Sequence, residues 1–393
     1  MNAPDNSRIV YLDYAATTPI DAAVLEEMTG CLRESASYGN PSAIHIAGRR
    51  ARWKIDAARE DLARLLGCSA RCLVFTSGAT EADNLAIIGA ARFRAHRGRH
   101  IVTVSTEHKA VLEACAALAK EGWDVTRIDP DTDGLVSPEA LADALRPDTQ
   151  LVSIMHVNNE TGVLQDIARL GRLCRERDVL FHVDAAQSVG KLPIDVGDWP
   201  VDLLSLTAHK FHGPQGVGAL YIADRAGCGV VPLLHGGSQE RRLRPGTPAL
   251  ALIAGLGAAA RIASGRMASD LVHVRRLHDR LLGGLAGLEG IRRNGSVTSN
   301  YPGIVNISAA GVEGESLMLA LEPVCVSSGS ACNSQSGEPS FVLKALGRTD
   351  REAQAAIRFS FGRDTHADDV DFALRRYVAA VTRLRALAPG QAA

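Results

Sequence analysis

The sequence has little excess charge and no long hydrophobic run. Its 393 residues contain 43 basic and 44 acidic side chains, a net charge of −1, so no overall field attracts nucleic acid or anionic lipid. The longest uncharged apolar stretch, residues 249–260, is interrupted by glycine and is shorter than the roughly 18 residues that span a membrane. The first ten residues, MNAPDNSRIV, lack the basic and apolar segments of a signal peptide. We expect a cytoplasmic protein without nucleic-acid or membrane partners.

The sequence also lacks the dense cysteine framework of small secreted domains. Its eight cysteines are scattered along the chain, which predicts reduced thiols. Cys68 and Cys72 have no second pair at the spacing of a metal site, so no metal is expected. Four others are expected to be small buried hydrophobic residues: Cys31, Cys115, Cys174 and Cys325.

Helical and strand patterns alternate along the chain, which is typical of an α/β fold. Helical patterns cover residues 57–66, 81–94 and 270–285, and short apolar runs cover 72–75, 101–104, 151–156, 179–183, 203–206 and 304–308. Such runs suit strands that are buried on both faces of a mostly parallel sheet. No flexible linker tract is present, so we expect two closely packed domains, with the smaller one beginning near residue 264.

Polar residues follow each predicted strand, where open α/β sheets bind their ligands. Residues 76–81 form a glycine-containing turn into a helix. They can hold a phosphate on free backbone N–H groups or form an ordinary Ser/Thr helix cap. His108 can face a cofactor, cap a helix or lie in the core. Asn158 and Asn159 can donate to a ring hydroxyl or build a turn.

Three further residues follow the next strands. Asp184 ends an apolar run, and a carboxylate there needs a partner such as a protonated ring nitrogen, a buried arginine or a helix N-terminus. Gln187 lies in the same segment. Lys210 can form a Schiff base, although a surface lysine is commoner. A phosphate cradle, a carboxylate and a lysine together are what pyridoxal phosphate requires, so the sequence predicts this cofactor.

Cys332 lies within a run of small polar residues, 327–337. This composition predicts a mobile loop. An exposed thiol in such a loop can be a nucleophile that reaches a substrate, or a tolerated surface cysteine.

Taken together, these segments resemble the cysteine desulfurases of the IscS/NifS type, within the class V aminotransferase group. The resemblance covers nearly the whole chain. It rests on an ordered set of motifs: residues 11–19 (YLDYAATTP), 39–42 (GNPS), 75–81 (FTSGATE), 155–160 (MHVNNE), 182–187 (HVDAAQ), 208–210 (AHK), 328–332 (SGSAC) and 356–360 (AIRFS).

The resemblance implies a homodimer of the pyridoxal phosphate fold type I, an α/β fold. Its large domain, residues 14–263, would bind the cofactor on a mostly parallel sheet flanked by helices. Residues 1–13 and 264–393 would form a smaller α+β domain that carries the mobile cysteine loop at about 326–338.

The same resemblance implies the roles of individual residues. Lys210 would bind the cofactor as a Schiff base, Asp184 would pair with its ring nitrogen, and His108 would stack on the ring. Catalytic roles fall to Lys210, His108 and Cys332. The other implied cofactor contacts are Ala79, Thr80, Asn159, Gln187, Thr207, His209 and, from the other subunit, Thr247. The implied substrate contacts are Asn40, Asn159 and Arg358, with Arg358 gripping the carboxylate.

The implied reaction converts L-cysteine to L-alanine and transfers sulfur to Cys332 as a persulfide. Lys210 would shuttle the α proton, and His108 is a candidate acid or base at the leaving sulfur. Cys332 would deliver the sulfur to an acceptor such as an iron–sulfur scaffold, and it could be a transient iron–sulfur ligand. The residues after the loop resemble the group that serves such scaffolds, whereas the short carboxyl-terminal tail lacks the segment that housekeeping members use to dock one.

Two local departures and two rival functions qualify this reading. Thr207 keeps the hydroxyl of the serine that is frequent there, whereas Pro245 replaces a small residue near the subunit-crossing loop. A selenocysteine lyase or an aminotransferase would need Lys210 and Asp184 without Cys332. An interaction protein that has lost its chemistry should lack Lys210 or Cys332. Both are present, which favours the desulfurase.

Overall fold

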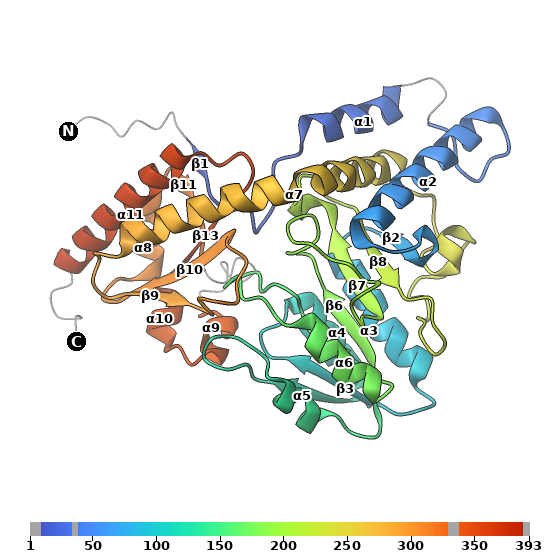
Figure 1. Cartoon of the computed structure of the whole chain (residues 1–393), viewed down its shortest axis with the longest axis horizontal. Helices are drawn as coiled ribbons and strands as arrows, with labels where there is room; N and C mark the ends of the chain where they lie inside the picture. Colours follow the sequence, from blue (N-terminus) through green and yellow to red (C-terminus); the bar gives the residue numbers. More distant parts are fainter. Residues whose placement is uncertain (1–8, 34–37, 329–337, 388–393) are drawn as a thin grey trace.

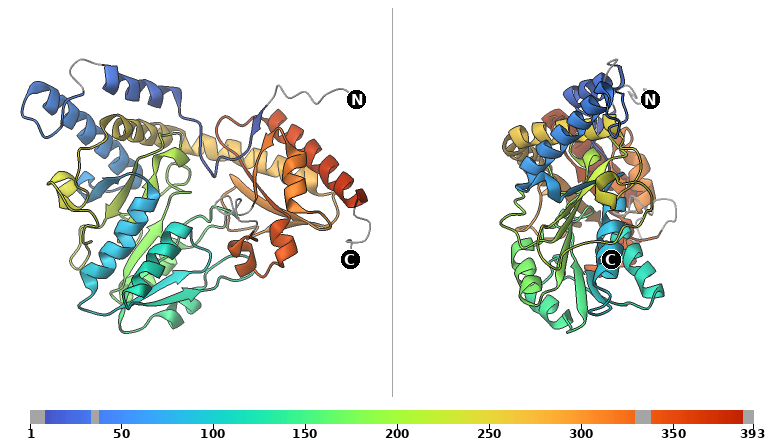
Figure 2. Two further views of the ribbon diagram at one scale, coloured as in Figure 1. Left: turned by 180° about the vertical axis from the view of Figure 1, so that it is seen from behind. Right: turned by 90° about the vertical axis from the view of Figure 1, so that its right-hand side faces the viewer.

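The computed structural model in Figure 1 describes residues 9–33, 38–328 and 338–387. Two groups of secondary structure lie side by side, one on a large sheet and one on a small sheet. A single long helix, α7 (Leu250–Leu285), runs along both groups, and the views of Figure 2 show the same arrangement.

The large sheet has seven strands in the order β2-β8-β7-β6-β5-β3-β4. Their bounds are β2 Leu73–Thr76, β3 His100–Val104, β4 Asp124–Ile128, β5 Thr149–Ser153, β6 Leu180–Asp184, β7 Leu203–Thr207 and β8 Gly218–Ile222. The strands from β7 to β4 pair in parallel, whereas β8 runs antiparallel to both of its neighbours. The expected α/β class with a mostly parallel sheet is therefore confirmed. The sequence patterns had not indicated β4 or β8.

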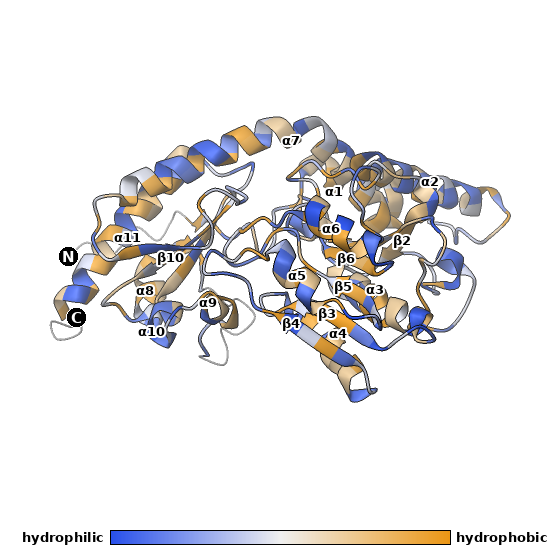
Figure 3. Ribbon diagram, turned by 60° about the horizontal axis from the view of Figure 1, so that its bottom comes forward, coloured by the Kyte–Doolittle hydropathy of each residue, from blue (hydrophilic) through white to orange (hydrophobic). Residues whose placement is uncertain are grey.

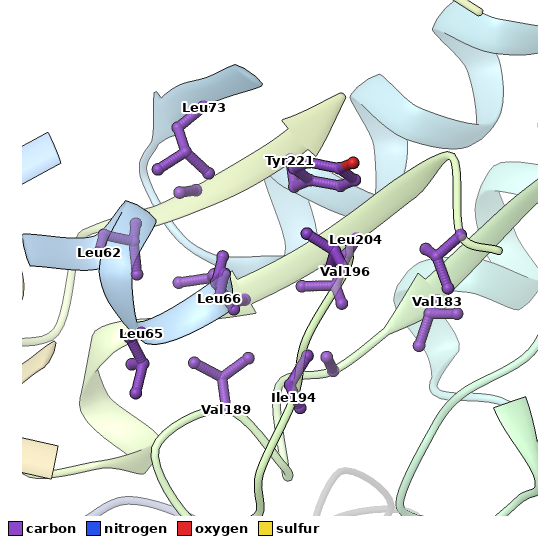
Figure 4. Close-up of a cluster of buried hydrophobic side chains, with 14 of the residues drawn as sticks. Leu62, Leu65, Leu66, Leu73, Val183, Val189, Ile194, Val196, Leu204 and Tyr221 are labelled. Atoms are coloured by element: carbon purple, nitrogen blue, oxygen red, sulfur yellow. The ribbon is translucent and has the colours of Figure 1, made fainter. Parts of the chain in front are cut away.

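Helices cover both faces of this sheet. They are α2 (Ile46–Leu66), α3 (Ala79–Arg94), α4 (Lys109–Lys120), α5 (Pro138–Ala144), α6 (Ile167–Glu176) and the first part of α7, with α1 (Ala22–Arg33) outside them. Alternate strand residues enter different cores. Val183 and Leu204 lie in the core cluster that also contains side chains of α2 (Figure 4), whereas Leu180 and Leu203 lie in the core that α3 and α4 cover. Burial on both faces explains why these strands read as continuous apolar runs.

The small sheet has four antiparallel strands in the order β12-β13-β10-β9. Its elements are β9 (Ile291–Asn294), β10 (Ile304–Ala309), β12 (Ser327–Ser328), β13 (Ala356–Ser360), α8 (Gly314–Leu321), α9 (Phe341–Ala345), α10 (Asp350–Gln354) and α11 (Ala367–Leu387). Nearby, β1 (Val10–Tyr11) pairs in parallel with β11 (Val324–Cys325). The amino-terminal segment thus lies beside a strand more than 300 residues away in the sequence.

The helix expected over 270–285 is the second half of α7, which begins 20 residues earlier. Its first half is rich in alanine and glycine because it packs closely on α2. A Cβ on Gly257 would lie 2.5 Å from Ala58 Cα. Within the described chain, α7 is the one helix long and apolar enough to cross a membrane, and half of its apolar window is buried in the protein. In Figure 3 its part over the small sheet alternates between polar and apolar residues, as in a helix packed on a core.

Candidate active site

A cavity of about 510 Å³ lies at the carboxyl ends of the parallel strands β5, β6 and β7. This is the edge at which the chemistry was expected, because parallel strands deliver their following residues to the same place. Ten of the predicted site residues line the cavity: Ala79, Thr80, His108, Asn159, Asp184, Gln187, Thr207, His209, Lys210 and Arg358.

One end of the cavity is the open N-terminus of α3. The helix begins at Ala79, and its N-cap is Gly78, which has no side chain to cap it. The Thr76 hydroxyl donates to the Gly78 carbonyl (2.9 Å) instead, so the ordinary Ser/Thr cap is the wrong alternative. Gly218 allows this turn to pack on β8, because a Cβ there would lie 2.8 Å from Gly78 Cα. The first N–H groups of α3 and the helix dipole therefore suit an anion.

Asp184 is buried at the end of β6 and lines the same cavity. Its Oδ1 accepts a hydrogen bond from the Ala186 backbone N–H at 2.9 Å, rather than from the buried arginine that was an open alternative. Burial raises the pKa of its carboxyl, whereas His108, the Ala186 N–H and Lys210 act in the opposite direction. Burial is the larger effect, so the pKa of the Asp184 carboxyl lies above its usual value, and a cation such as a protonated ring nitrogen beside it would favour its ionised form.

A second layer of acids lies behind Asp184 and had not been predicted. Asp83 and Glu107 are fully buried, and burial and the charge on Asp184 raise the pKa of both well above the usual range. Asp83 Oδ1 lies 3.6 Å from Nε2 of the buried His182. Burial lowers the His182 pKa to about 3, so this imidazole is neutral. Neighbouring buried carboxylates resist ionising together, and the pKa is raised furthest for Asp83 and Glu107, so Asp184 is the acid of the three that ionises most readily.

His108 is both a helix cap and a cavity residue. It is the N-cap of α4, and its Nδ1 accepts from the Ala110 backbone N–H at 3.1 Å, while the ring lines the cavity. An accepting Nδ1 carries no proton, so the neutral ring holds its proton on Nε2. Two of the three alternatives left open for His108, a helix cap and a cavity-facing ring, are therefore realised together.

Lys210 and Gln187 meet at one backbone segment near the amino terminus. Lys210 Nζ donates to the carbonyls of Ala15 and Ala16 (2.6 and 2.7 Å). Gln187 Nε2 donates to the Ala15 carbonyl at 2.8 Å. These carbonyls had not been predicted, because a backbone acceptor leaves no signal in the residue type. Lys210 is half-buried in the cavity wall, so the surface-lysine alternative is wrong.

Thr207 at the end of β7 and His209 just after it line the cavity near α3. Thr207 is buried and its Oγ1 donates to the Val217 carbonyl at 3.3 Å. His209 Nδ1 lies 3.2 Å from Thr17 Oγ1. Burial and the charges on Lys210 and Lys191 lower the His209 pKa to about 4. His209 is thus a neutral hydrogen-bonding group at neutral pH.

Arg358 is a buried cation on β13 of the small sheet, 2% exposed. Its guanidinium donates to the Asn159 carbonyl (2.8 Å), Asp13 Oδ1 (2.6 Å) and Ser327 Oγ (3.0 Å). Its Nε has no hydrogen-bond partner in the described part of the chain. Not all of the five N–H donors of Arg358 are used by these partners, and the residue lines the cavity.

The two neighbouring asparagines differ in role. Asn158 Oδ1 accepts from the backbone N–H groups of Glu160 and Thr161, both at 2.9 Å, so Asn158 builds the turn. Asn159 lines the cavity. The turn alternative thus holds for the first residue and the cavity alternative for the second.

Three predicted residues are not brought together with the others. Asn40 and Thr247 are exposed and do not line the cavity of this single chain. Cys332 and most of the predicted cysteine loop lie outside the described residues. Cys31, Cys115 and Cys174 are buried as expected, whereas Cys325 is only half-buried at the edge strand β11. No group of three or more His, Cys, Asp or Glu side chains in residues 9–33, 38–328 and 338–387 could hold a metal ion.

An α/β sheet with a lysine, a buried carboxylate and a helix N-terminus at one edge defines an enzyme that holds an anionic ring cofactor. The aminotransferase class-V family model matches residues 10–372. Cysteine desulfurase IscS of Photobacterium profundum is 51% identical over 97% of this chain and 94% of that protein. Its namesake from Serratia proteamaculans is 50% identical over the same shares. The chain therefore belongs to the aminotransferase class-V family, and within it to the cysteine desulfurases.

Solved structures agree with this assignment. A NifS-like protein is 37% identical with a TM-score of 0.89, covering 96% of this chain and all of that chain. A structure of SspA in complex with cysteine is 40% identical with a TM-score of 0.78, covering 89% and 98%. The resemblance on which the sequence prediction rested is confirmed.

The enzyme uses pyridoxal 5′-phosphate, and the cavity fits this group. The uncapped N-terminus of α3 suits a phosphate, and the buried Asp184 carboxylate suits a protonated ring nitrogen. The Lys210 amine, held by two carbonyls, suits a covalent bond to an aldehyde. These are the parts that the protein must supply for such a cofactor.

Proposed function

We propose that this protein is a pyridoxal phosphate-dependent cysteine desulfurase that converts L-cysteine to L-alanine and transfers the sulfur to Cys332 as a persulfide. One observation carries the proposal above all: Lys210, Asp184 and the open end of α3 line one cavity with Arg358. The chain that builds this cavity is about half identical to cysteine desulfurases over nearly its full length.

When bound, the cofactor supplies an electron sink for the carbon atoms of the substrate. We propose that Lys210 binds it covalently and that Lys210 Nζ moves the proton at the substrate α-carbon. Asp184 would pair with the ring nitrogen and favour a proton on it, and the higher pKa of Asp83 makes Asp184 the acid that ionises more readily of the two. Ala79, Thr80, Thr207 and His209 hold the phosphate, and Asn159 and Gln187 flank the ring oxygen.

Arg358 binds the substrate carboxylate in this proposal. Its guanidinium is already fixed by Asp13, Ser327 and the Asn159 carbonyl, so little conformational entropy is lost when a carboxylate arrives. The buried position strengthens the charge-assisted hydrogen bonds that it makes.

Cys332 accepts the sulfur. Its thiolate attacks the substrate sulfur, a new S–S bond forms, and the C–S bond breaks with its electron pair passing to the carbon side. That carbon side takes up protons and leaves as alanine, so that cysteine and the Cys332 thiol become alanine and a persulfide. His108, which carries its proton on Nε2, is suited to donate a proton at the leaving sulfur.

The enzyme works as a homodimer in this account. Large apolar side chains are exposed on and next to α1 and α2: Leu25, Leu32, Tyr38, Ile44, Ile46 and Trp53. Such a concentration of exposed apolar surface is typical of an interface. Asn40 lies in the same region, and Thr247 is also exposed. We propose that Thr247 completes the partner's cofactor site and that Asn40 contacts the substrate.

The remaining features of the proposal concern domains and partners. The two main cores favour a division into residues 14–263 and 1–13 with 264–393. One core draws on residues from Val24 to Ala263, and the other on Val10, Leu12 and residues from Val274 to Val381. We propose a cytoplasmic protein whose persulfide serves an iron–sulfur scaffold or another acceptor protein.

The first prediction tests the sulfur transfer. Purified holoenzyme is exposed briefly to L-cysteine without reductant, alanine is assayed, and peptides are analysed by mass spectrometry. We expect alanine together with one added sulfur on the Cys332 peptide. Cys332→Ala should bind the cofactor normally but form no persulfide, whereas Cys228→Ala, which changes a thiol outside the cavity, should behave like the parent.

Other outcomes identify the rivals. Alanine without sulfur on Cys332 would contradict the persulfide step and favour a lyase mechanism. Neither product from a protein that binds the cofactor would contradict desulfurase activity and favour an interaction protein.

A further inference from the structure

Lys191 is a second lysine close to the site, four residues after Gln187, and its role had not been predicted. Its Nζ donates to Gln187 Oε1 at 2.9 Å and lies 5.6 Å from the centre of the Tyr301 ring. Lys191 and Lys210 also line one small cavity of about 40 Å³. Lys191 therefore contacts the site through Gln187 rather than by lining the main cavity.

The hydrogen bonds of Gln187 determine which way its buried amide points. Its Oε1 accepts from Lys191, and its Nε2 donates to the Ala15 carbonyl at 2.8 Å. In the flipped orientation Oε1 would face the Ala15 carbonyl oxygen, which is a repulsive contact, and the Lys191 amine would lose its acceptor on Gln187. One N–H of Nε2 is thereby left for the main cavity that Gln187 lines.

We infer that Lys191 is a positioning residue, which holds Gln187 so that its amide presents a donor, not an acceptor, to the ring oxygen of the cofactor. This inference rests on the proposed function. An N–H donor stabilises the ionised ring oxygen, whereas a carbonyl in the same place would repel it.

The backbone holds Lys191 firmly in this position. Gly190 has a φ of +75°, and a Cβ there would lie 2.7 Å from Phe211, the residue after Lys210. The Gln187–Lys191 turn thus packs directly on the segment that carries Lys210. Val189 N–H and Leu192 N–H close the turn on the Ala185 and Ser188 carbonyls.

The charges around Lys191 affect its protonation but not its ability to donate to Gln187. Burial, followed by the positive charges of Lys210 and Arg358, holds the Lys191 pKa well below its usual range. His209 and His212 also face Lys191, and its charge lowers the pKa of both rings. Tyr301 completes the groups packed against the amine. A lysine amine donates to Gln187 Oε1 whether or not it carries the extra proton.

The second prediction concerns Lys191→Met, which keeps a similar length and apolar contact with Tyr301 but removes the donor. We expect the apoprotein to bind pyridoxal phosphate about tenfold more weakly, as for the loss of a hydrogen bond to a charged group. The pH at which the visible band of the bound cofactor titrates should rise by about one unit. Lys344→Met, which removes an exposed lysine paired with Asp350, should change neither value.

A double variant separates positioning from a direct charge effect. If Lys191 acts through Gln187, Lys191→Met should add no further shift to Gln187→Ala. A full additional shift in that background, or parent-like values for Lys191→Met alone, would overturn the inference. Failure of the parent protein to bind the cofactor at all would instead overturn the proposed function, so the two failures are distinguishable.

Discussion

The large and small sheets contribute to the site in different ways. The large sheet delivers Asp184, Lys210 and Asn159 from the carboxyl ends of parallel strands and the segments after them, so that side chains distant in the sequence reach one edge. The small sheet delivers Arg358 from the middle of β13, a strand that runs antiparallel to both of its neighbours. The sequences of the loops on the large sheet can therefore change with little effect on the stability of the sheet. Arg358, in contrast, is part of a strand, so its substitution also affects the packing of that strand.

The two contributions also differ in their response to pH. Behind the cavity, the large sheet buries groups that titrate, among them Asp83, Glu107 and His182. The small sheet supplies a guanidinium, which stays charged at all relevant pH values. We therefore expect the groups buried by the large sheet to make stability depend on pH.

The largest effect in this comparison is expected for Arg358→Lys. Lysine keeps the charge but loses the planar fork that holds a carboxylate and, at the same time, Asp13 and Ser327. We expect kcat/KM for cysteine to fall about 100-fold, mainly through KM. The fall should be similar from pH 6 to pH 8, and steady-state kinetics at several pH values measures it.

Arg348→Lys is the matched control. Arg348 is also a buried arginine, and its Nε donates to Asn294 Oδ1 at 2.9 Å, but it does not line the cavity. Its substitution should lower stability without changing KM. An unchanged KM for Arg358→Lys would remove Arg358 from substrate binding.

A smaller effect, on stability, is expected for His182→Gln. His182 is fully buried between Ser153 and Ser205, and burial lowers its pKa to about 3, below the value of about 6.5 in an unfolded chain. Below pH 6.5 the unfolded chain takes up a proton that the folded protein refuses, so stability is complete above pH 6.5 and falls with pH towards 3. At pH 5 this single group should lower the free energy of unfolding by about 2 kcal/mol.

The measurement is denaturant unfolding from pH 7 to pH 5. His182→Gln loses contacts at every pH, so the informative quantity is the loss of unfolding free energy between pH 7 and pH 5. This loss should be about 2 kcal/mol smaller in the variant than in the parent. The exposed His96→Gln should leave this loss unchanged. A parent-like loss for His182→Gln would mean that His182 is not the buried neutral group described above.

The contrast between the sheets also explains what could be predicted from the sequence. The strands β3, β5, β6 and β7 were predictable because burial on both faces gives continuous apolar runs. Once these strands were located, the residues after them could be predicted as site residues. Strand β4, which reads Asp124–Ile128, is more polar because it is the edge strand of the sheet. Arg358 had no signal from the local pattern and was identified only through the family resemblance.

Some site features have no signature in the residue types. The carbonyls of Ala15 and Ala16 act through the backbone, and the role of Lys191 depends on a turn that brings it back to Gln187. The second layer of acids was missed for a different reason. Asp83 lies within α3, where an aspartate in a helical pattern reads as a surface residue, whereas in the structure it is fully buried.

The central claim is that the end of β7 presents Lys210, and not its neighbour Lys191, to the cofactor. Borohydride reduction of the holoenzyme fixes the cofactor to its lysine, and peptide mass spectrometry then locates it. We predict the added mass on the peptide that contains Lys210, and neither that mass nor the visible band in Lys210→Ala. Cofactor mass on Lys191 in the parent protein would contradict the assignment of the site.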